Sequence, residues 1–188
     1  MEQAKFKALI MDEQAMDRAL TRIAHEIIEH NEGAEGIALV GVLRRGVPLA
    51  ERLADKIEAI EGVRPKIGEL DISFYRDDFS SHIAPVLHAT KIMFPIDGAK
   101  VILVDDVLYT GRTVRSALDA LMDFGRAKSV QLAVMIDRGH RELPIRADYV
   151  GKNVPSSHEE DVRVSVKPLD DKDSVEIWGV EKSVGGAK

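Results

Sequence analysis

The amino-acid sequence predicts one α/β domain, spanning residues 1–188, built on a doubly wound and mostly parallel β-sheet. Short apolar runs typical of buried strands alternate along the chain with amphipathic helical patterns. Of the 188 residues, 45% are hydrophobic, which is enough to form one core without cross-links. Because the chain contains no cysteine, disulfide scaffolds, thiol nucleophiles and cysteine-bound metals are excluded.

The elements of the first half can be predicted in order. Residues 11–32 carry apolar positions three and four apart, which predicts an amphipathic helix with Asp12 as its N-cap and its end near Gly33. A continuous apolar run at 37–42 is typical of a buried parallel strand. It is followed by a helix and then by another strand, which we expect at 47–60 and 66–74.

The second half continues the alternation. We expect a strand, a helix and two further strands at residues 101–104, 112–124, 130–136 and 148–150. The segments 162–166 and 175–178 alternate like a terminal hairpin. Right-handed crossovers between such strands give a parallel sheet, and ligands bind beyond the carboxyl ends of its strands. The connection at 74–98 is too long for a simple turn, so we expect a flap over that edge.

Charge and the chain's first residues bear on location and partners. The 26 Lys and Arg residues stand against 32 Asp and Glu, and a net charge of −6 disfavours non-specific binding to nucleic acid. The first seven residues lack the pattern of a signal peptide. The longest stretch without charged residues, 79–90, is too short for a membrane span. We expect a cytoplasmic protein that binds neither DNA nor a membrane.

The most informative segment is a turn that joins a strand to a helix. Two acids, Asp105 and Asp106, follow an apolar run, and Thr110-Gly111-Arg112-Thr113 stands at the expected helix start. Backbone N–H groups, hydroxyls and the helix dipole at such a turn suit a phosphate group, which Gly111 lets approach closely. Paired carboxylates suit a ribose cis-diol. Alternatively, both acids form a turn and Thr110 only caps the helix. No Walker loop or dinucleotide-binding glycine motif is present.

Four apolar residues, two acids and a Thr-Gly-x-Thr turn resemble the signature of type I phosphoribosyltransferases that binds 5-phosphoribosyl 1-pyrophosphate (PRPP). Three further segments, 18–26, 75–78 and 137–149, are similar to the PyrR family of pyrimidine-operon attenuators with uracil phosphoribosyltransferase activity. The similarity covers nearly the whole chain. It implies the type I phosphoribosyltransferase fold, with a flexible flap and a small C-terminal hood region.

The resemblance implies an enzyme that joins uracil to PRPP, giving UMP and pyrophosphate, with Mg²⁺ held mainly by PRPP. Asp105 and Asp106 are the implied catalytic residues, and they face the ribose hydroxyls directly or through metal-bound water. Implied PRPP-binding residues are Arg44, Arg45, Arg76, Asp105, Asp106, Val107, Leu108, Tyr109, Thr110, Gly111, Arg112 and Thr113. Implied uracil-binding residues are Met135, Ile136, Arg138 and Val162.

One face of the first helix raises the question of RNA binding. Arg18, Thr21, Arg22 and His25 share an exposed face by their spacing, and by charge alone this is a solvated helix face. The resemblance implies that this face, with Arg141 and Arg146, binds a hairpin of pyrimidine leader mRNA in a homodimer or higher homo-oligomer, favoured by UMP or UTP.

Three other functions stay open at this point. The chain could be a salvage uracil phosphoribosyltransferase without RNA regulation, or a catalytically weak nucleotide sensor. A purine phosphoribosyltransferase would share the phosphate turn but not the segment 137–149.

Overall fold

The structure is a computed structural model that describes residues 4–73, 75 and 90–180. Helices and strands alternate through most of it. In chain order the elements are β1 (Ala4–Met11), α1 (Glu13–Asn31), β2 (Ile37–Val42), α2 (Gly46–Glu61), β3 (Lys66–Leu70), β4 (Lys100–Leu108), α3 (Arg112–Met122), β5 (Ser129–Asp137), β6 (Tyr149–Asn153), β7 (Glu160–Ser165) and β8 (Ser174–Val180).

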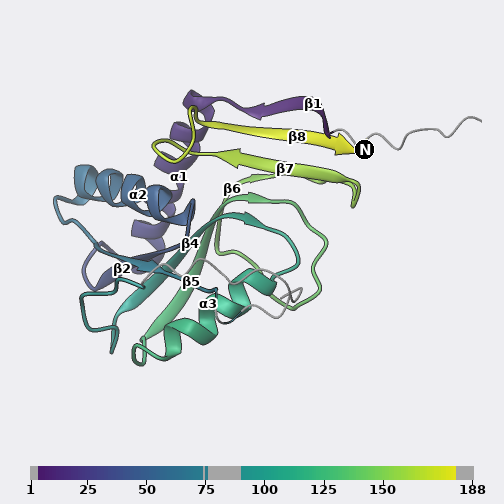
Figure 1. Ribbon diagram of the computed structural model, residues 1–188. Coiled ribbons are helices and arrows are strands. Elements are labelled where there is room, and N and C mark those ends of the chain that lie inside the picture. Colours follow the sequence, from purple (N-terminus) through teal and green to yellow (C-terminus); the bar gives the residue numbers. More distant parts are fainter. Residues whose placement is uncertain (1–3, 74, 76–89, 181–188) are drawn as a thin grey trace, which may run out of the picture.

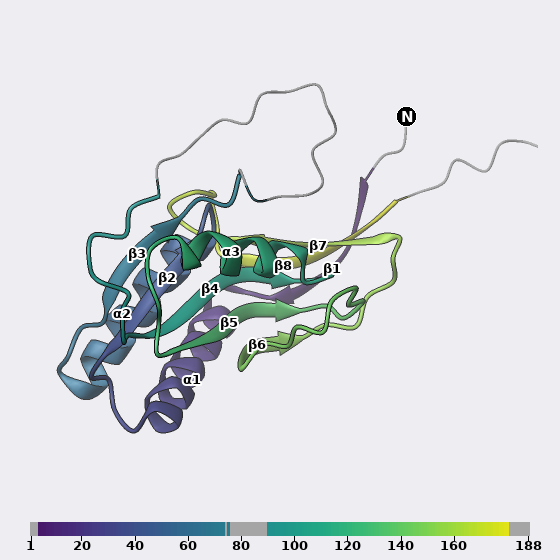
Figure 2. The same cartoon turned by 90° about the horizontal axis from the view of Figure 1, so that it is seen from below.

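Five parallel strands form the main sheet, in the order β3-β2-β4-β5-β6 (Figure 1). Helices α1 and α2 cover one face of this sheet and α3 covers the other (Figure 2). Every residue of β2 is buried, because helices cover both faces of the strand. The predicted doubly wound, mostly parallel sheet is confirmed.

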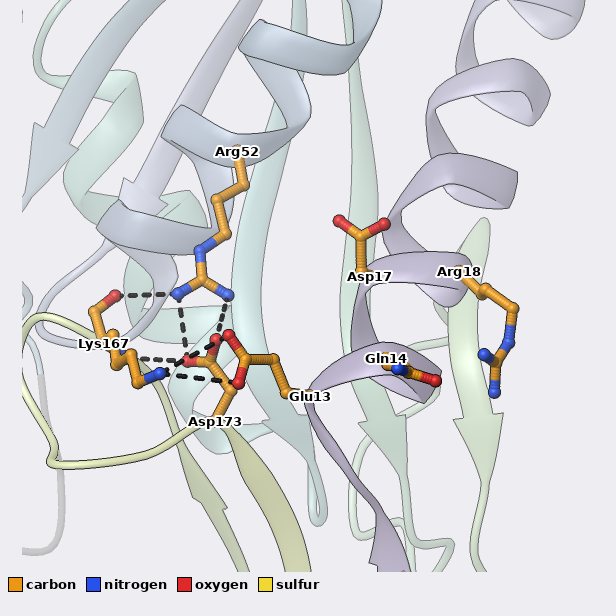
Figure 3. A pocket seen from close by; sticks show the side chains of 7 residues that line it. All are labelled: Glu13, Gln14, Asp17, Arg18, Arg52, Lys167 and Asp173. Carbon is orange, nitrogen blue, oxygen red and sulfur yellow. Dashed lines mark hydrogen bonds and ion pairs between the residues drawn. The ribbon is translucent and has the colours of Figure 1, made fainter.

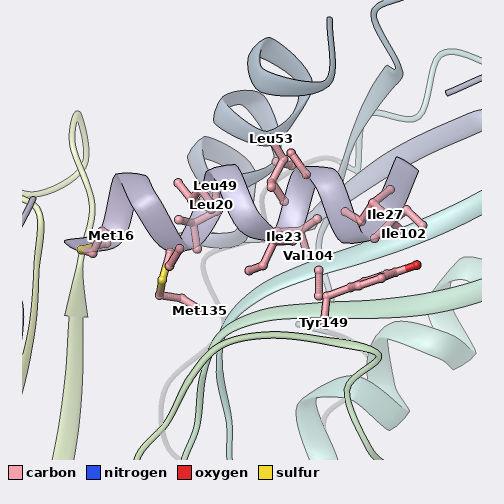
Figure 4. Packing of buried hydrophobic residues seen from close by; sticks show 14 of the residues in the cluster. Met16, Leu20, Ile23, Ile27, Leu49, Leu53, Ile102, Val104, Met135 and Tyr149 are labelled. Carbon is pink, nitrogen blue, oxygen red and sulfur yellow. The ribbon is translucent and has the colours of Figure 1, made fainter. Parts of the chain in front are cut away.

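The larger core lies between α1, α2 and the sheet (Figure 4). Leu20, Ile23 and Ile27 of α1 are at most 2% exposed, as their helical spacing predicts. Full burial of each such side chain contributes about 1.5–3 kcal/mol. The side chain of Asp12 accepts a hydrogen bond from the Ala15 amide at 2.8 Å, which confirms the predicted N-cap. This packing fixes α1 against the sheet and leaves its other side for solvent or a partner.

A smaller antiparallel sheet has the order β1-β8-β7. Its β7–β8 hairpin confirms the terminal hairpin predicted from the sequence. Strand β1 was not predicted, because its first four residues are exposed and show no apolar alternation. Its pairing with β8 joins the two ends of the described chain, from Ala4 opposite Val180 to Met11 opposite Val175, and no local pattern indicates such a contact.

Strand β3, at the edge of the main sheet, ends earlier than predicted. We expected it to run to residue 74, but β3 ends at Leu70. The Asp71 carboxylate accepts hydrogen bonds from the amide and the hydroxyl of Ser73, and this local turn diverts the chain from the sheet. Of the predicted flap, residues 74 and 76–89 lie outside the described residues. Where the chain returns, Lys91 pairs with Glu69 in an antiparallel bridge.

The other predicted helices and strands are present, with their ends shifted by a few residues. No helix in the described ranges is both long and apolar enough to cross a membrane.

Candidate functional site

A cavity of about 390 Å³ lies where β4 extends beyond its neighbour β2. Pairing between β4 and β2 ends at Val104, but β4 continues along β5 to Leu108. The two acids therefore belong to the last part of the strand, with one side open toward the loop after β2. The lining residues are Val42, Leu43, Arg44, Arg45, Asp71, Ile72, Ser73, Asp105, Asp106, Val107 and Thr113.

Two glycines bring the start of α2 against this strand end. A Cβ atom on Gly46 would lie 2.2 Å from the carbonyl oxygen of Val104, and one on Gly41 would lie 2.5 Å from the Cα of Val47. No side chain fits at such distances, so the close approach requires glycine at both positions. It places Arg45, the N-cap residue of α2, beside the acids of β4.

The two acids are held by the backbone that follows each of them. Asp105, 6% exposed, accepts a hydrogen bond from the Asp106 amide at 2.9 Å, and Asp106 accepts one from the Val107 amide at 2.8 Å. Burial raises the pKa of Asp106, against the lowering effects of a hydrogen bond with Asp105 and of the charge on Arg45. The charged form of a buried carboxylate with a raised pKa is stabilised by an additional positive charge nearby.

The guanidinium of Arg45 is held from the far end of the chain. It donates two hydrogen bonds of 2.9 Å to the carboxylate of Asp170, in the loop between β7 and β8. Asp170 also accepts a hydrogen bond from the Val166 amide at 2.8 Å. Sequence reasoning missed Asp170, since no local signal relates it to the loop after β2. It also missed Asp71 and Ser73, which line the cavity beyond β3.

The predicted phosphate turn leads directly into α3. Gly111 is the N-cap residue of this helix and has a φ of 94°, a left-handed conformation that favours glycine. Gly111 has no side chain to cap the helix, but the Thr110 hydroxyl accepts a hydrogen bond of 3.4 Å from the Arg112 amide, so the alternative interpretation of Thr110 as a helix cap stays open. The Thr110 carbonyl accepts hydrogen bonds from the amides of Glu142 and Leu143, which holds the turn against the loop after β5. The start of α3 is thus available to an anion beside Thr113.

This arrangement of a strand end, two acids and a helix start matches a known domain. The model of the phosphoribosyl transferase domain family matches residues 9–171. The chain belongs to the phosphoribosyltransferase family.

Several relatives of this phosphoribosyltransferase carry one name. A protein of Acetivibrio thermocellus is 60% identical over 95% of this chain and 97% of its own length, and one of Clostridioides difficile is 58% identical over 91% and 97%. Both are named bifunctional protein PyrR. The predicted resemblance to that family is confirmed.

Solved structures confirm the predicted type I phosphoribosyltransferase fold. A hypoxanthine-guanine phosphoribosyltransferase of Bacillus anthracis has a TM-score of 0.69 at 21% identity, covering 94% of this chain and 99% of that one. The hypoxanthine phosphoribosyltransferase of Trypanosoma cruzi has a TM-score of 0.69 at 17% identity, covering 94% and 98%. At such low identity the likeness concerns the fold alone.

Of the other residues predicted to bind PRPP, three lie in or next to the turn. The Tyr109 ring lies under the guanidinium of Arg138, 4.2 Å from it, and Leu108 is buried. Arg112 donates a hydrogen bond of 2.6 Å to Glu142. Arg76 lies outside the described residues.

The four predicted uracil residues do not share one cavity. Met135, Ile136 and Val162 are at most 7% exposed and pack in the larger core. Arg138 is 7% exposed and donates hydrogen bonds to the Ser156 hydroxyl and to the carbonyls of Ser157 and Glu160. It borders a second cavity, of about 380 Å³, at the carboxyl ends of β5 and β6. The lining residues there are Asp137, Arg138, Gly139, His140, Asn153, Pro155 and Ser156.

The predicted RNA residues on α1 differ in how free their side chains are. Arg18 and His25 are exposed. Arg22 donates hydrogen bonds to the carbonyls of Val150 and Gly151 at 2.9 and 2.6 Å, so it fastens α1 to β6. The Thr21 hydroxyl donates to the Asp17 carbonyl and accepts from Lys56.

The two predicted RNA residues after β5 also differ in how far their side chains are engaged. Arg141 donates hydrogen bonds to Asp137 and to the carbonyls of Ile145 and Tyr109. Arg146 is exposed, between Ile145 and Ala147, which pack against the smaller core on the side of α3.

Proposed function

We propose that this phosphoribosyltransferase joins uracil to PRPP, giving UMP and pyrophosphate. The observation that carries the proposal is the cavity at the end of β4, where Asp105 and Asp106 lie between the start of α3 and the arginines Arg44 and Arg45. Ligands of parallel α/β sheets bind at this position. The name shared by relatives about 60% identical supports both uracil as the acceptor and a second, regulatory activity.

The chain's own residues act by binding and orientation. The turn from Thr110 to Thr113 holds the 5′-phosphate, and the two carboxylates accept hydrogen bonds from the ribose hydroxyls. The bond from C1′ to N1 of uracil forms as the bond from C1′ to the pyrophosphate oxygen breaks, and the proton that N1 loses passes to the released pyrophosphate or to water. Arg44 and Arg45 offset the negative charge that develops on the leaving group. Because the base itself is the nucleophile and is held in line, no nucleophilic side chain is needed.

The residues of the cavity fit Mg²⁺. Asp105 and Asp106 offer the carboxylate oxygens that this ion prefers, and the raised pKa of Asp106 indicates a charge that its surroundings compensate only in part. Within the described ranges no three carboxylate or imidazole groups converge to hold a metal by themselves. We therefore place most of the ion's ligands on PRPP. When bound, Mg²⁺ would supply positive charge to the pyrophosphate.

For uracil we propose the carboxyl end of β5. The cavity bordered by Asp137, Arg138 and His140 opens there, next to the phosphate turn through the contact of Arg138 with Tyr109. Met135, Ile136 and Val162 would shape this region from within the core.

The proposed second function is regulation by binding a hairpin of pyrimidine leader mRNA. Exposed Arg18 and His25 on α1, and exposed Arg146, offer groups that can contact unpaired bases and phosphates. A homodimer or higher homo-oligomer would bring such groups from two or more chains together on one surface. UMP or UTP in the PRPP cavity would favour RNA binding by stabilising one arrangement of the loops around it.

One pair of measurements tests both functions. Pyrophosphate release is measured with PRPP and either uracil or hypoxanthine, and we expect release with uracil. Binding to the chain's own pyrimidine leader hairpin is measured with and without UMP, for the unmodified protein and for His25→Ala. We expect UMP to strengthen binding and the variant to lose it.

Each other outcome identifies one alternative. PRPP binding without pyrophosphate release would indicate a nucleotide sensor. Catalysis without hairpin binding above that of an unrelated RNA would indicate a salvage enzyme. Release with hypoxanthine would indicate a purine enzyme.

A further inference from the structure

A polar cavity of about 750 Å³ lies at the start of α1, between that helix, α2 and the loop that joins β7 to β8 (Figure 3). Its volume is within the range of small-molecule sites, about 300–1,000 Å³. It shares no lining residue with the cavity at Asp105 and Asp106. The lining residues are Glu13, Gln14, Asp17, Arg18, Arg52, Lys167 and Asp173.

One wall of this cavity is held by ion pairs. Arg52 donates two hydrogen bonds of 2.9 Å to Asp173, whose side chain is 5% exposed, and a third to the Lys167 carbonyl (Figure 3). The ammonium of Lys167 lies 3.4 Å from Glu13. These contacts order the wall before any ligand arrives, and they leave little net charge on it.

The other wall is α1, and two of its polar side chains are not engaged by the described residues. Gln14 and Arg18, one helical turn apart, make no side-chain hydrogen bond or ion pair with the part of the chain that the structure describes. Asp17, on the same wall, pairs with Lys56, which also donates to Thr21. The cavity is thus continuous with the predicted RNA residues, since Arg18 belongs to both and Thr21 adjoins it.

We propose that this cavity receives an unpaired guanine of the leader RNA, an inference that rests on the proposed RNA-binding function. The three acids and three bases of the lining balance each other, so the cavity suits a neutral polar ring better than an isolated phosphate. Guanine presents the O6 and N7 acceptors for the Arg18 guanidinium, and N1–H and N2–H₂ donors for Glu13 and the Gln14 amide oxygen. Unpaired bases are what proteins read in RNA hairpins.

The test compares hairpin binding by the unmodified protein, by Gln14→Leu and by a control, Glu29→Gln, on the same helix but outside the cavity. The probes are the leader hairpin itself and a set of hairpins in which one unpaired guanosine at a time is replaced by inosine, which lacks the 2-amino group. At one position we expect inosine and Gln14→Leu each to weaken binding about 5- to 150-fold. Because both changes remove the same contact, their combination is expected to weaken binding no further.

The outcomes separate this inference from the function on which it rests. If the unmodified protein does not bind the hairpin, the RNA function fails, and the guanine site fails with it. If the protein binds but Gln14→Leu behaves like Glu29→Gln, only the guanine site is wrong. If Gln14→Leu weakens guanine and inosine hairpins equally, or changes only the salt dependence, the cavity contacts the backbone and the inference is overturned. Unchanged pyrophosphate release by Gln14→Leu would show that the variant is folded.

Discussion

Arg45 and Asp170 are joined by two hydrogen bonds of 2.9 Å although 125 residues separate them in the chain. The pair links the PRPP cavity at the end of β4 to the loop between β7 and β8. The hydrogen bond from Arg45 lowers the pKa of Asp170, and the Val166 amide also favours its charged form. The small antiparallel sheet thereby orients a guanidinium that we assign to pyrophosphate.

Replacing Asp170 with asparagine tests this orientation. In Asp170→Asn the amide cannot pair with both guanidinium nitrogens as a carboxylate does, so Arg45 loses its fixed position. The pair is half exposed, and we expect an increase in the KM for PRPP of up to about 5-fold, corresponding to about 1 kcal/mol. Asp170→Glu should recover most of the effect. A decrease in KM would show instead that Asp170 competes with pyrophosphate for Arg45.

The catalytic assignment predicts a large effect at Asp106. Asp106→Asn keeps the shape of the side chain but loses the charge that serves the ribose and the metal. We expect kcat/KM for uracil to fall about 100-fold or more, with the melting temperature nearly unchanged. The matched control is Asp119→Asn on the exposed side of α3, which should retain full activity. Equal activity of both variants would remove Asp106 from the site.

Two residues of α1 should behave differently although both were predicted to contact RNA. His25 is exposed and has no side-chain hydrogen bond within the described ranges, so His25→Ala should change the free energy of unfolding by less than about 0.5 kcal/mol. Arg22→Ala loses two hydrogen bonds to β6 and should destabilise the fold by about 1–3 kcal/mol. Urea unfolding measures both. Equal stability would show that Arg22 does not fasten α1 to β6.

The Arg52–Asp173 pair predicts a dependence of stability on pH. Burial alone would raise the pKa of Asp173, but hydrogen bonds from Arg52 and the Lys167 amide lower it below its ordinary value. A carboxyl with a lowered folded pKa stabilises the fold above its unfolded pKa of about 3.9, and this contribution is lost as the pH falls through the folded pKa. Asp173→Asn should therefore be less stable at pH 7 and lose less stability below about pH 4. The free energy of unfolding is measured for both proteins from pH 7 to pH 3, and a constant difference between them over this range would contradict the prediction.

The close approach of α2 to β4 predicts that Gly46 tolerates no side chain. In Gly46→Ala the added Cβ would lie 2.2 Å from the Val104 carbonyl oxygen, so the helix start must shift. We expect destabilisation of about 1–3 kcal/mol and loss of PRPP binding, because Arg45 shifts with it. Gly62→Ala is a control at the other end of α2, where no atom lies near the added Cβ but the φ of 72° is strained. It should leave PRPP binding intact.

Local patterns were sufficient for most of the sheet and for the phosphate turn. A strand buried on both faces needs a continuous apolar run, and β2 has the predicted ends, 37 and 42. A side chain that accepts from a free helix-start amide is a local signal, and Asp12 supplies it for α1 as predicted. The residues of the predicted phosphate turn are close in sequence, and the structure places Gly111 and Thr113 at the start of α3 as expected, while their contact with phosphate stays a prediction.

Contacts between distant segments could not be predicted in this way. The sequence showed two arginines after β2 but not that Asp170 would hold one of them. It placed Val162 near uracil, but did not show that this side chain would pack in the larger core.

The sequence by itself determined the order of the elements from α1 onward, the parallel sheet and the strand-to-helix turn that follows the two acids. It could do so because hydrophobic period, capping and turn chemistry act over a few residues. Only the tertiary structure decided which charged side chains are free. Arg22 and Arg141 are engaged by carbonyls of other segments, whereas Arg18 lies beside a cavity and makes no side-chain hydrogen bond or ion pair with the described residues. Such partners depend on how the chain packs over long separations, because a guanidinium binds whatever acceptors the fold brings to it.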